Sequence, residues 1–206
     1  MIAIIDYDAG NILSVEKALQ YLGEETVCTG ERDVILQADK VILPGVGAFG
    51  DAMKKLRNRK LDEVIWEVVE NKTPFLGICL GLQLLFESSE ESKGIDGLGI
   101  LPGRIVRLPE AKGLKVPHVG WNSLHFPSEG TLFHGIAEGA YVYFVHSFYL
   151  QAEEAATVKA TTQYGVTVHA SVERDNVFAC QFHPEKSSDT GLKILNNFIT
   201  FTGREG

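Results

Sequence analysis

The sequence has few cysteines, no cluster of basic residues and no long hydrophobic run, and each absence excludes a class of protein. Its three cysteines, Cys28, Cys79 and Cys180, lie far apart and form no C-x-x-C pair, which argues against a disulfide framework and a structural zinc site. The formal net charge is −8 and Lys and Arg are dispersed, so we expect no nucleic-acid-binding face. No apolar run approaches the roughly 18 residues of a membrane-spanning helix.

The residue totals and the N-terminus favour a soluble cytoplasmic protein of one domain, which we expect to cover residues 1–206. Of the 206 residues, 45% are hydrophobic, enough to bury a core without disulfides or metals. The first residues, MIAIID, lack the basic region of a secretory signal peptide and read as a strand. We expect neither a metal nor a cofactor.

Short apolar runs alternate with amphipathic segments in the first half of the chain. The apolar runs, which we expect to be strands, are residues 1–6, 25–29, 40–45 and 73–78. The amphipathic segments, which we expect to be helices, are residues 11–23, 48–56, 61–71 and 80–86. Such alternation predicts an α/β fold with a flavodoxin-like open, mostly parallel sheet and helices on both faces.

The second half is rich in β-forming residues separated by turns. Strands are expected at residues 103–108, 140–150, 156–163, 166–173 and 177–183, and we expect this half of the chain to add extra antiparallel strands to the domain. The last segment, residues 188–203, reads as a helix, with Ser188 or Asp189 as its N-cap and Gly203 at its end. Gly23 is expected to end the first helix in the same way.

Cys79 lies between an expected strand and an expected helix. Gly77-Ile78-Cys79-Leu80-Gly81 is the G-x-S-x-G elbow pattern with sulfur in place of oxygen. Small neighbours let the nucleophile stand exposed at the sheet edge, a helix N-terminus favours a thiolate, and the N–H of Leu80 can bind an oxyanion. The pattern indicates a nucleophile, and the alternative is a small buried cysteine in an ordinary strand-to-helix turn.

A thiolate nucleophile needs a base, and one of the six histidines fits that role. His183 follows the apolar strand VFACQF, and Pro184 ends that strand. Glu185 lies two residues after His183, where its carboxylate would orient the imidazole. The end of a strand is the expected place for a site in an open α/β sheet. Alone, His-Pro-Glu would be a turn with a surface carboxylate, but together with Cys79 it predicts a catalytic triad.

GICLGLQLLFE together with QFHPEK strongly resembles the class I (triad) glutamine amidotransferase family. The resemblance implies that Cys79 attacks the side-chain amide of glutamine and that His183 delivers a proton to the departing ammonia. Water then releases glutamate from the thioester.

The same resemblance implies a set of substrate-binding residues. Gln83, one helical turn after the nucleophile, would hold the α-amino end of the substrate, with help from Glu91. The backbone at Ser147 and Phe148 would receive the substrate carboxylate.

The oxyanion loop of the family is a glycine turn, and the resemblance assigns Gly45, Val46 and Gly47 to it. The stretch also matches the dinucleotide-binding G-x-G-x-x-G pattern, but the next strand ends in Cys79 instead of the acidic residue that this pattern requires. A plain glycine-rich loop is the other alternative. Because glycine makes a peptide flip sterically cheap, we expect the N–H of Val46 to point away from Cys79 in the isolated chain, leaving the oxyanion hole incomplete.

Five further stretches of the sequence point to one group of subunits within this family. IIDYDAGN, PGVGAFGDAM, VPHVGWN, YFVHSFY and HPEKS resemble the glutaminase subunits of imidazole glycerol phosphate synthase, over essentially the whole chain. This implies a heterodimer with a (β/α)8-barrel cyclase subunit of histidine biosynthesis, which receives the ammonia through a channel. By position it implies that Asn11, Trp121, Tyr143 and Lys186 contact the partner. Asp8 departs from the glycine usual in the family, in a loop expected to face the partner.

Several alternatives remain open. The chain could serve another synthase, for anthranilate, aminodeoxychorismate or pyridoxal phosphate. It could act alone as a cysteine hydrolase of the same fold, such as a γ-glutamyl hydrolase, or bind without catalysis. Cys28 and Cys180 read as core thiols, and core packing is the alternative role for Trp121 and Tyr143.

Overall fold

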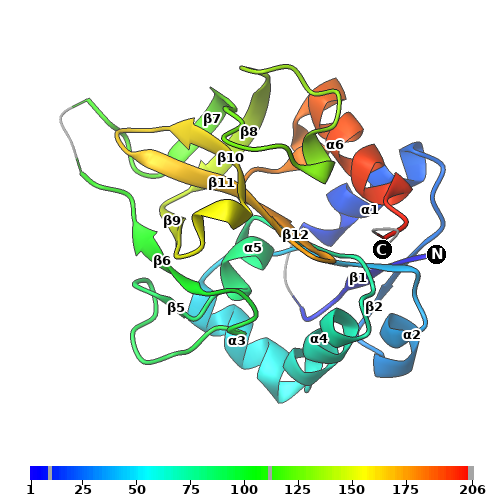
Figure 1. Cartoon of the computed structure of the whole chain (residues 1–206). Coiled ribbons are helices and arrows are strands. Elements are labelled where there is room, and N and C mark those ends of the chain that lie inside the picture. Colours follow the sequence, from blue (N-terminus) through cyan, green and yellow to red (C-terminus); the bar gives the residue numbers. More distant parts are fainter. Residues whose placement is uncertain (9–10, 111–112, 204–206) are drawn as a thin grey trace.

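The structure, a computed structural model, describes residues 1–8, 11–110 and 113–203, and its main feature is a 10-stranded sheet between helices (Figure 1). The helices are α1 (Ile12–Tyr21), α2 (Arg32–Leu36), α3 (Phe49–Asn58), α4 (Leu61–Glu70), α5 (Leu80–Leu84) and α6 (Ser188–Thr200), with 3-10 turns η1 (Thr131–Phe133), η2 (Ala155–Thr157) and η3 (Pro184–Lys186). The strands are β1 (Ile2–Ile5), β2 (Thr26–Thr29), β3 (Lys40–Leu43), β4 (Phe75–Ile78), β5 (Ser88–Ser89), β6 (Gly103–Arg107), β7 (His118–Ser123), β8 (Tyr141–His146), β9 (Phe148–Ala152), β10 (Val158–Gln163), β11 (Thr167–Arg174) and β12 (Val177–Cys180).

One half of the main sheet is parallel. Its strand order is β2-β1-β3-β4-β12, and every neighbouring pair in it is parallel. This is the flavodoxin-like order, and it confirms the predicted fold class. The last strand of this half, β12, comes from near the end of the chain, so it places residues of the C-terminal segment beside β4.

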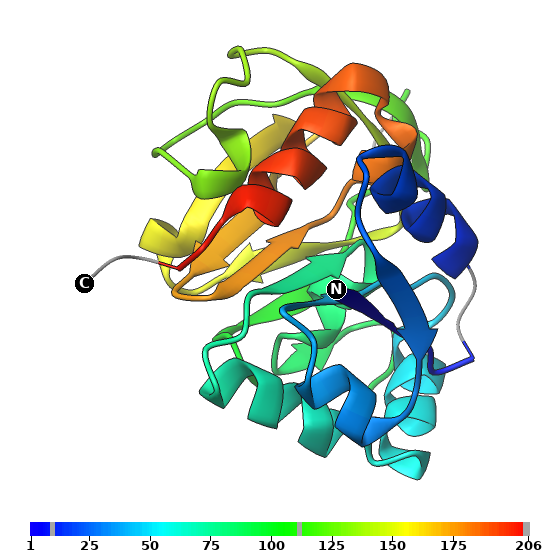
Figure 2. The same ribbon diagram turned by 90° about the vertical axis from the view of Figure 1, so that its right-hand side faces the viewer.

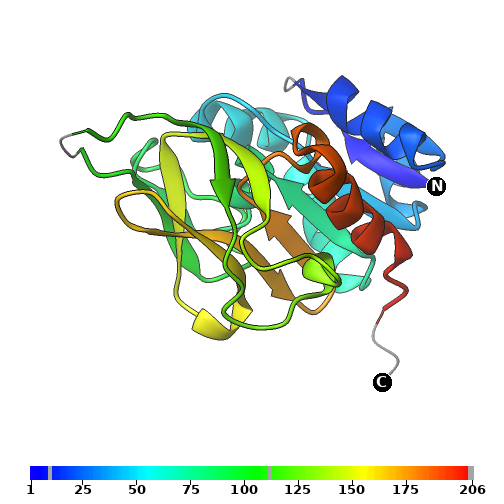
Figure 3. The same cartoon turned by 90° about the horizontal axis from the view of Figure 1, so that it is seen from above.

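Alternate side chains of the buried strands enter two separate cores. Ala3 and Ile5 of β1 pack in the core with α2, α3 and α4, whereas Ile2 and Ile4 pack in the core with α1 and α6. Figure 2 shows these two groups of helices on opposite sides of the sheet, and Figure 3 shows α1 and α6 side by side. Successive residues of a strand point to opposite faces, so a strand covered on both faces is apolar at every position.

The second half adds antiparallel strands and a small second sheet. β11, β9 and β6 extend the main sheet through antiparallel pairs, and β10 pairs with β11. The predicted strand at 140–150 is wrong as a single element, because β8 pairs with β7 in a two-stranded sheet whereas β9 belongs to the main sheet. Ser147 alone separates these two strands, so the chain changes sheets there.

The last helix differs from prediction at both ends. Ser187 is its N-cap, in place of Ser188 or Asp189, and the helix ends at Thr200, before Gly203. The hydroxyl of Ser187 makes no cap, because it bonds to other backbone groups.

Two smaller features concern the N-terminal half. Gly23 follows α1 with a φ of +89°, which confirms the predicted helix end. α2 was not predicted, since its five residues are too few to show a helical period. Within the ranges that the structure describes, no helix is both long and apolar enough to cross a membrane.

Candidate active site

The junction of β4 and α5 forms a strained turn with Cys79 at its tip. Cys79 has a φ of +56° and a ψ of −107°, a conformation that residues other than glycine seldom adopt. The glycines on either side of Cys79 leave no room for a side chain. A Cβ on Gly81 would lie 1.9 Å from the Leu43 carbonyl oxygen, and a Cβ on Gly77 would lie 2.7 Å from the Gly81 carbonyl oxygen. The turn therefore has the geometry of a nucleophile elbow.

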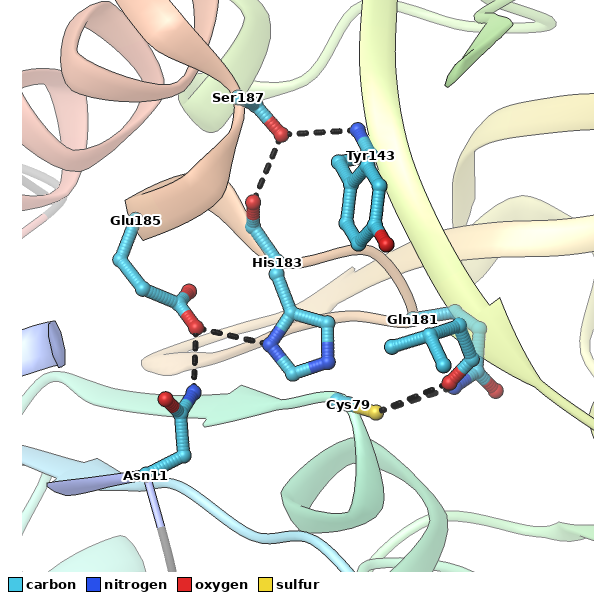
Figure 4. Close-up of polar contacts among 8 residues, drawn as sticks. Asn11, Cys79, Tyr143, Gln181, His183, Glu185 and Ser187 are labelled. Carbon is cyan, nitrogen blue, oxygen red and sulfur yellow. Dashed lines mark hydrogen bonds and ion pairs between the residues drawn. The ribbon is translucent and has the colours of Figure 1, made fainter. Parts of the chain in front are cut away.

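The pairing of β4 with β12 brings Cys79 and His183 to the same edge of the sheet. Ile78 lies opposite Cys180, so the residues that follow the two strands are neighbours. Both side chains are buried, with 7% of Cys79 and 1% of His183 exposed. The Nδ1 of His183 lies 2.7 Å from Glu185 Oε1, and its Nε2 is buried and has no hydrogen-bond partner among the residues that the structure describes. Figure 4 shows the imidazole between the Glu185 carboxylate and the Cys79 sulfur.

The surroundings of His183 keep its imidazole charged. Burial, the largest single influence, lowers the pKa of His183, but contacts with Cys79 and Glu185 together raise it to about 9. At neutral pH the ring therefore carries a proton on each nitrogen. The Nδ1–H donates to Glu185, and the Nε2–H is available to the site. An imidazolium beside a cysteine stabilises a thiolate and can later protonate a leaving amine.

Asn11 completes the surroundings of the buried Glu185 carboxylate. Its Nδ2 donates to Glu185 Oε1 at 2.7 Å, the same oxygen that accepts from His183 (Figure 4). The other oxygen, Oε2, is buried and unpaired in the part of the chain that the structure describes. The sequence predicted Asn11 only as a partner-interface residue, because 174 residues separate it from Glu185.

The loop after β3 lies against the turn at Cys79. One of its carbonyl groups accepts a hydrogen bond from the N–H of Leu80, the predicted oxyanion donor. The N–H of Leu80 donates to the Gly45 carbonyl oxygen at an N···O distance of 3.4 Å. The Gly45–Val46 peptide is trans, so the N–H of Val46 points the opposite way, away from Leu80. The sequence predicts an N–H of Val46 directed away from Cys79, and its direction relative to the sulfur stays a prediction. Tyr7, which sequence reasoning overlooked, donates its hydroxyl to the Pro44 carbonyl at 3.0 Å and so holds the start of the loop.

A cavity of about 310 Å³ opens beside Cys79. The four predicted substrate residues, Gln83, Glu91, Ser147 and Phe148, all line it, together with residues of the oxyanion loop. Glu91 Oε2 accepts the backbone N–H of the first residue of α3 at 2.8 Å, which places its carboxylate next to that loop. The structure thus brings together the predicted substrate residues and the predicted triad.

Hydrogen bonds fix the side chain of Gln83. Its Nε2 donates to the Phe148 carbonyl at 3.1 Å and to Gln181 Oε1 at 3.0 Å. Since both amide protons are engaged, Oε1 is the atom left to accept from a substrate ammonium group. Gln181 Nε2 in turn lies 3.8 Å from Cys79 Sγ (Figure 4). No feature of the sequence pointed to Gln181, whose side chain is fully buried beside the nucleophile.

The predicted partner-interface residues on η3 and on the sheet β7–β8 lie at the surface. Trp121 is 50% exposed, and its ring meets that of the half-buried Tyr143 edge to face, with 6.1 Å between centroids. Lys186 is exposed. Val119 and Val145 are exposed on the same face of the small sheet, and Val145 also lines the cavity. Packing in the core therefore does not account for the position of the Trp121 side chain.

The other two cysteines lie outside the cavity. Cys180 is fully buried in β12, and burial raises the pKa of its thiol well above the usual value. Burial also raises the pKa of Cys28 to about 11, with a further contribution from Glu16. Both thiols are therefore protonated at neutral pH. Across residues 1–8, 11–110 and 113–203, no group of three or more His, Cys, Asp and Glu is placed to hold a metal ion.

Comparison with known proteins places the chain among enzymes of one family. The family model described as glutamine amidotransferase class-I matches residues 3–201. The chain is 53% identical over 197 residues to the imidazole glycerol phosphate synthase subunit HisH of Moorella thermoacetica, which covers 96% of this chain and 93% of that protein. It is 47% identical over 199 residues to the protein of the same name from Methanocaldococcus jannaschii, covering 97% and 98%.

A solved structure supports the same fold. The structure of PurLQS from Thermotoga maritima matches with a TM-score of 0.75 at 21% identity, over 96% of both chains. The chain therefore belongs to the class-I glutamine amidotransferase family and, within it, to the imidazole glycerol phosphate synthase subunits.

Proposed function

We propose that this chain hydrolyses glutamine to glutamate and ammonia as the glutaminase subunit of an imidazole glycerol phosphate synthase. The observation that carries the proposal is the buried arrangement of Cys79, His183 and Glu185 at a strained turn beside a cavity of about 310 Å³. Membership of the family supports glutamine as the substrate.

The reaction follows from the positions of these three side chains. The Cys79 thiolate attacks the carbon of the side-chain amide, and negative charge moves onto the amide oxygen. His183 donates its Nε2 proton to the nitrogen as the C–N bond breaks, which leaves a thioester and ammonia. Neutral His183 then takes a proton from the water that attacks the thioester, and the C–S bond breaks to release glutamate. Glu185 stabilises the imidazolium throughout.

The oxyanion must be stabilised by backbone N–H groups, and in the free chain neither of the two expected N–H groups is available to it. The N–H of Leu80 is hydrogen-bonded to the Gly45 carbonyl, and the N–H of Val46 points away from Leu80. A flip of the Gly45–Val46 peptide would release the first donor and supply the second. Because one missing oxyanion donor typically costs about 100- to 1000-fold in kcat, we expect low activity until a ligand-bound partner favours the flipped peptide.

The partner in this proposal is a (β/α)8-barrel cyclase subunit, which makes imidazole glycerol phosphate and AICAR in histidine biosynthesis. The exposed apolar face that carries Trp121 and Tyr143 supports docking close to the cavity, with Lys186 and Asn11 at the same contact. A closed channel is needed because ammonia released into water is protonated and loses its reactive lone pair. We propose that residues 1–206 act as one domain, which the sheet shared by both halves of the chain supports, and that the protein works in the cytoplasm.

The test is glutamate release from glutamine by the pure chain, alone and with the cyclase barrel and its phosphoribosyl aminoimidazole-carboxamide ligand. We expect a low rate that rises about 100-fold or more when both are present, and no release by Cys79→Ala. Release by Cys79→Ala would overturn the assignment of the nucleophile. A rate that is high without a partner would favour a stand-alone hydrolase, and a low rate that only another synthase raises would favour that synthase.

A further inference from the structure

Two buried histidines, His118 and His146, have no part in the chemistry proposed above, yet they lie directly behind the cavity. His118 Nδ1 and His146 Nε2 are 3.0 Å apart, and both side chains are buried. His146 Nδ1 lies 2.9 Å from the Phe148 carbonyl oxygen. Since His146 and Phe148 line the cavity, the pair of histidines supports part of its wall.

The hydrogen bonds of this pair run in only one direction. The Phe148 carbonyl can only accept, so His146 carries its proton on Nδ1 and presents Nε2 as an acceptor. His118 must then donate from Nδ1, and its Nε2 faces the amide nitrogen of Asn122 at 3.4 Å. That amide is itself oriented, because its Nδ2 donates to the Gln163 carbonyl at 2.9 Å and its Oδ1 accepts the next backbone N–H at 2.8 Å.

Both rings are neutral at physiological pH. Burial lowers the pKa of His118 to about 4 and that of His146 to about 3. Protonation of His146 would also place two N–H donors face to face across 3.0 Å. The ring of His118 is stacked between those of Phe144 and Tyr164, at 4.8 Å and 3.8 Å between centroids, so it has little freedom to turn.

The consequence of this chain of bonds is a fixed orientation of Gln83. The Phe148 carbonyl accepts from both His146 Nδ1 and Gln83 Nε2, which uses both of its lone pairs. The second proton of Gln83 Nε2 is donated to Gln181. With its nitrogen held twice, Gln83 presents only Oε1 to the cavity, and a carbonyl oxygen accepts strongly from an ammonium group.

We propose that His146, held as one tautomer by His118, is a positioning residue that makes the cavity selective for amides carrying an α-ammonium group. It acts through the Phe148 carbonyl and the carboxamide of Gln83, because both of its ring nitrogens are engaged within the protein. This inference rests on the proposed glutaminase activity. The test therefore compares two substrates, glutamine and 4-carbamoylbutyrate, which is glutamine without its α-amino group.

Two variants of the complex with the cyclase and its ligand test the proposal. His146→Leu removes both ring nitrogens, whereas the amide nitrogen of His146→Asn can take the place of Nδ1 and still donate to Phe148. We expect kcat/KM for glutamine to fall about tenfold or more in the leucine variant, mainly through KM, while that for 4-carbamoylbutyrate changes by less than about threefold. His146→Asn should recover most of the preference for glutamine.

Equal losses for both substrates in the leucine variant would indicate a merely structural role and overturn the proposal, as would unchanged discrimination. If the wild-type complex hydrolyses neither substrate, the proposed function fails and this inference fails with it.

A measurement on the wild-type chain does not depend on folding of a variant. We expect a scalar coupling across the N–H···N bond between His118 Nδ1 and His146 Nε2 in ¹⁵N NMR spectra, with one neutral tautomer for each ring between about pH 6 and 8. Two tautomers for His146, or no coupling, would overturn the proposal.

Discussion

Protonation of His183 makes the stability of the chain depend on pH. The pKa of His183 is about 9 in the folded chain, against about 6.5 in an unfolded one. Each tenfold difference in proton affinity corresponds to about 1.4 kcal/mol, so the protonated ring stabilises the fold by about 3 kcal/mol. The folded-state pKa is the higher one, so this contribution is complete below about pH 6.5 and is lost as the pH rises through about 9. With 1% of the residue exposed, solvent screening reduces it little.

The assay is urea unfolding at about pH 6 and about pH 10, for the wild type and for His183→Gln. We expect the free energy of unfolding of the wild type to fall by about 3 kcal/mol more than that of the variant between these pH values. Other groups that titrate in this range, such as Cys28 and the N-terminal amine, are present in both proteins and cancel in the difference. Cys79→Ser lacks the thiol that raises the pKa of His183, so its loss of stability should be smaller. Parallel pH profiles for wild type and His183→Gln would refute the reasoning.

Three further substitutions test the turn, the loop and the partner face. Gly81→Ala should prevent folding or cost more than about 3 kcal/mol in urea unfolding, because its Cβ would meet a backbone carbonyl of β3 at 1.9 Å. Gly139→Ala, with open space but a φ of +79°, should cost only about 1 kcal/mol, and equal costs would contradict the steric argument. Val46→Pro lacks the N–H that the flipped loop supplies, so cyclase-stimulated glutamate release should fall about 100-fold, and wild-type stimulation would exclude the flip. Trp121→Ala should weaken cyclase binding about tenfold or more in calorimetry, whereas Trp66→Ala, 40% exposed on α4, should not; equal effects would remove Trp121 from the interface.

Much of the parallel half of the fold and the core of the candidate site could be predicted, because the signals are local. Strands covered on both faces are apolar throughout, and Gly77 and Gly81 mark a turn too tight for larger side chains. Glu185 lies two residues after His183, with only Pro184 between them, so a short stretch of sequence is enough to predict this contact.

Other contacts carried no local signal. The change of sheet at Ser147 divides a run of β-forming residues that looks continuous, because both strands have the same composition and differ only in their partners. The contact of Asn11 with Glu185 and the bond between His118 and His146 join residues far apart in sequence. No periodicity links such residues, and only the packing of their elements decides that they meet.

The sequence by itself determined which residue types are available at the strand ends: a thiol at a tight glycine-flanked turn, an imidazole beside a carboxylate, and glycines in the loop after β3. Only the tertiary structure decided their relations, because pairing β4 with β12 sets Cys79 beside His183. It also decided the directions of the buried polar groups. The Gly45 carbonyl accepts a hydrogen bond from the N–H of Leu80, and the histidine pair sets the orientation of the Gln83 carboxamide through the Phe148 carbonyl. Buried polar groups must be hydrogen-bonded, so each one pairs with the partner that the surrounding fold supplies.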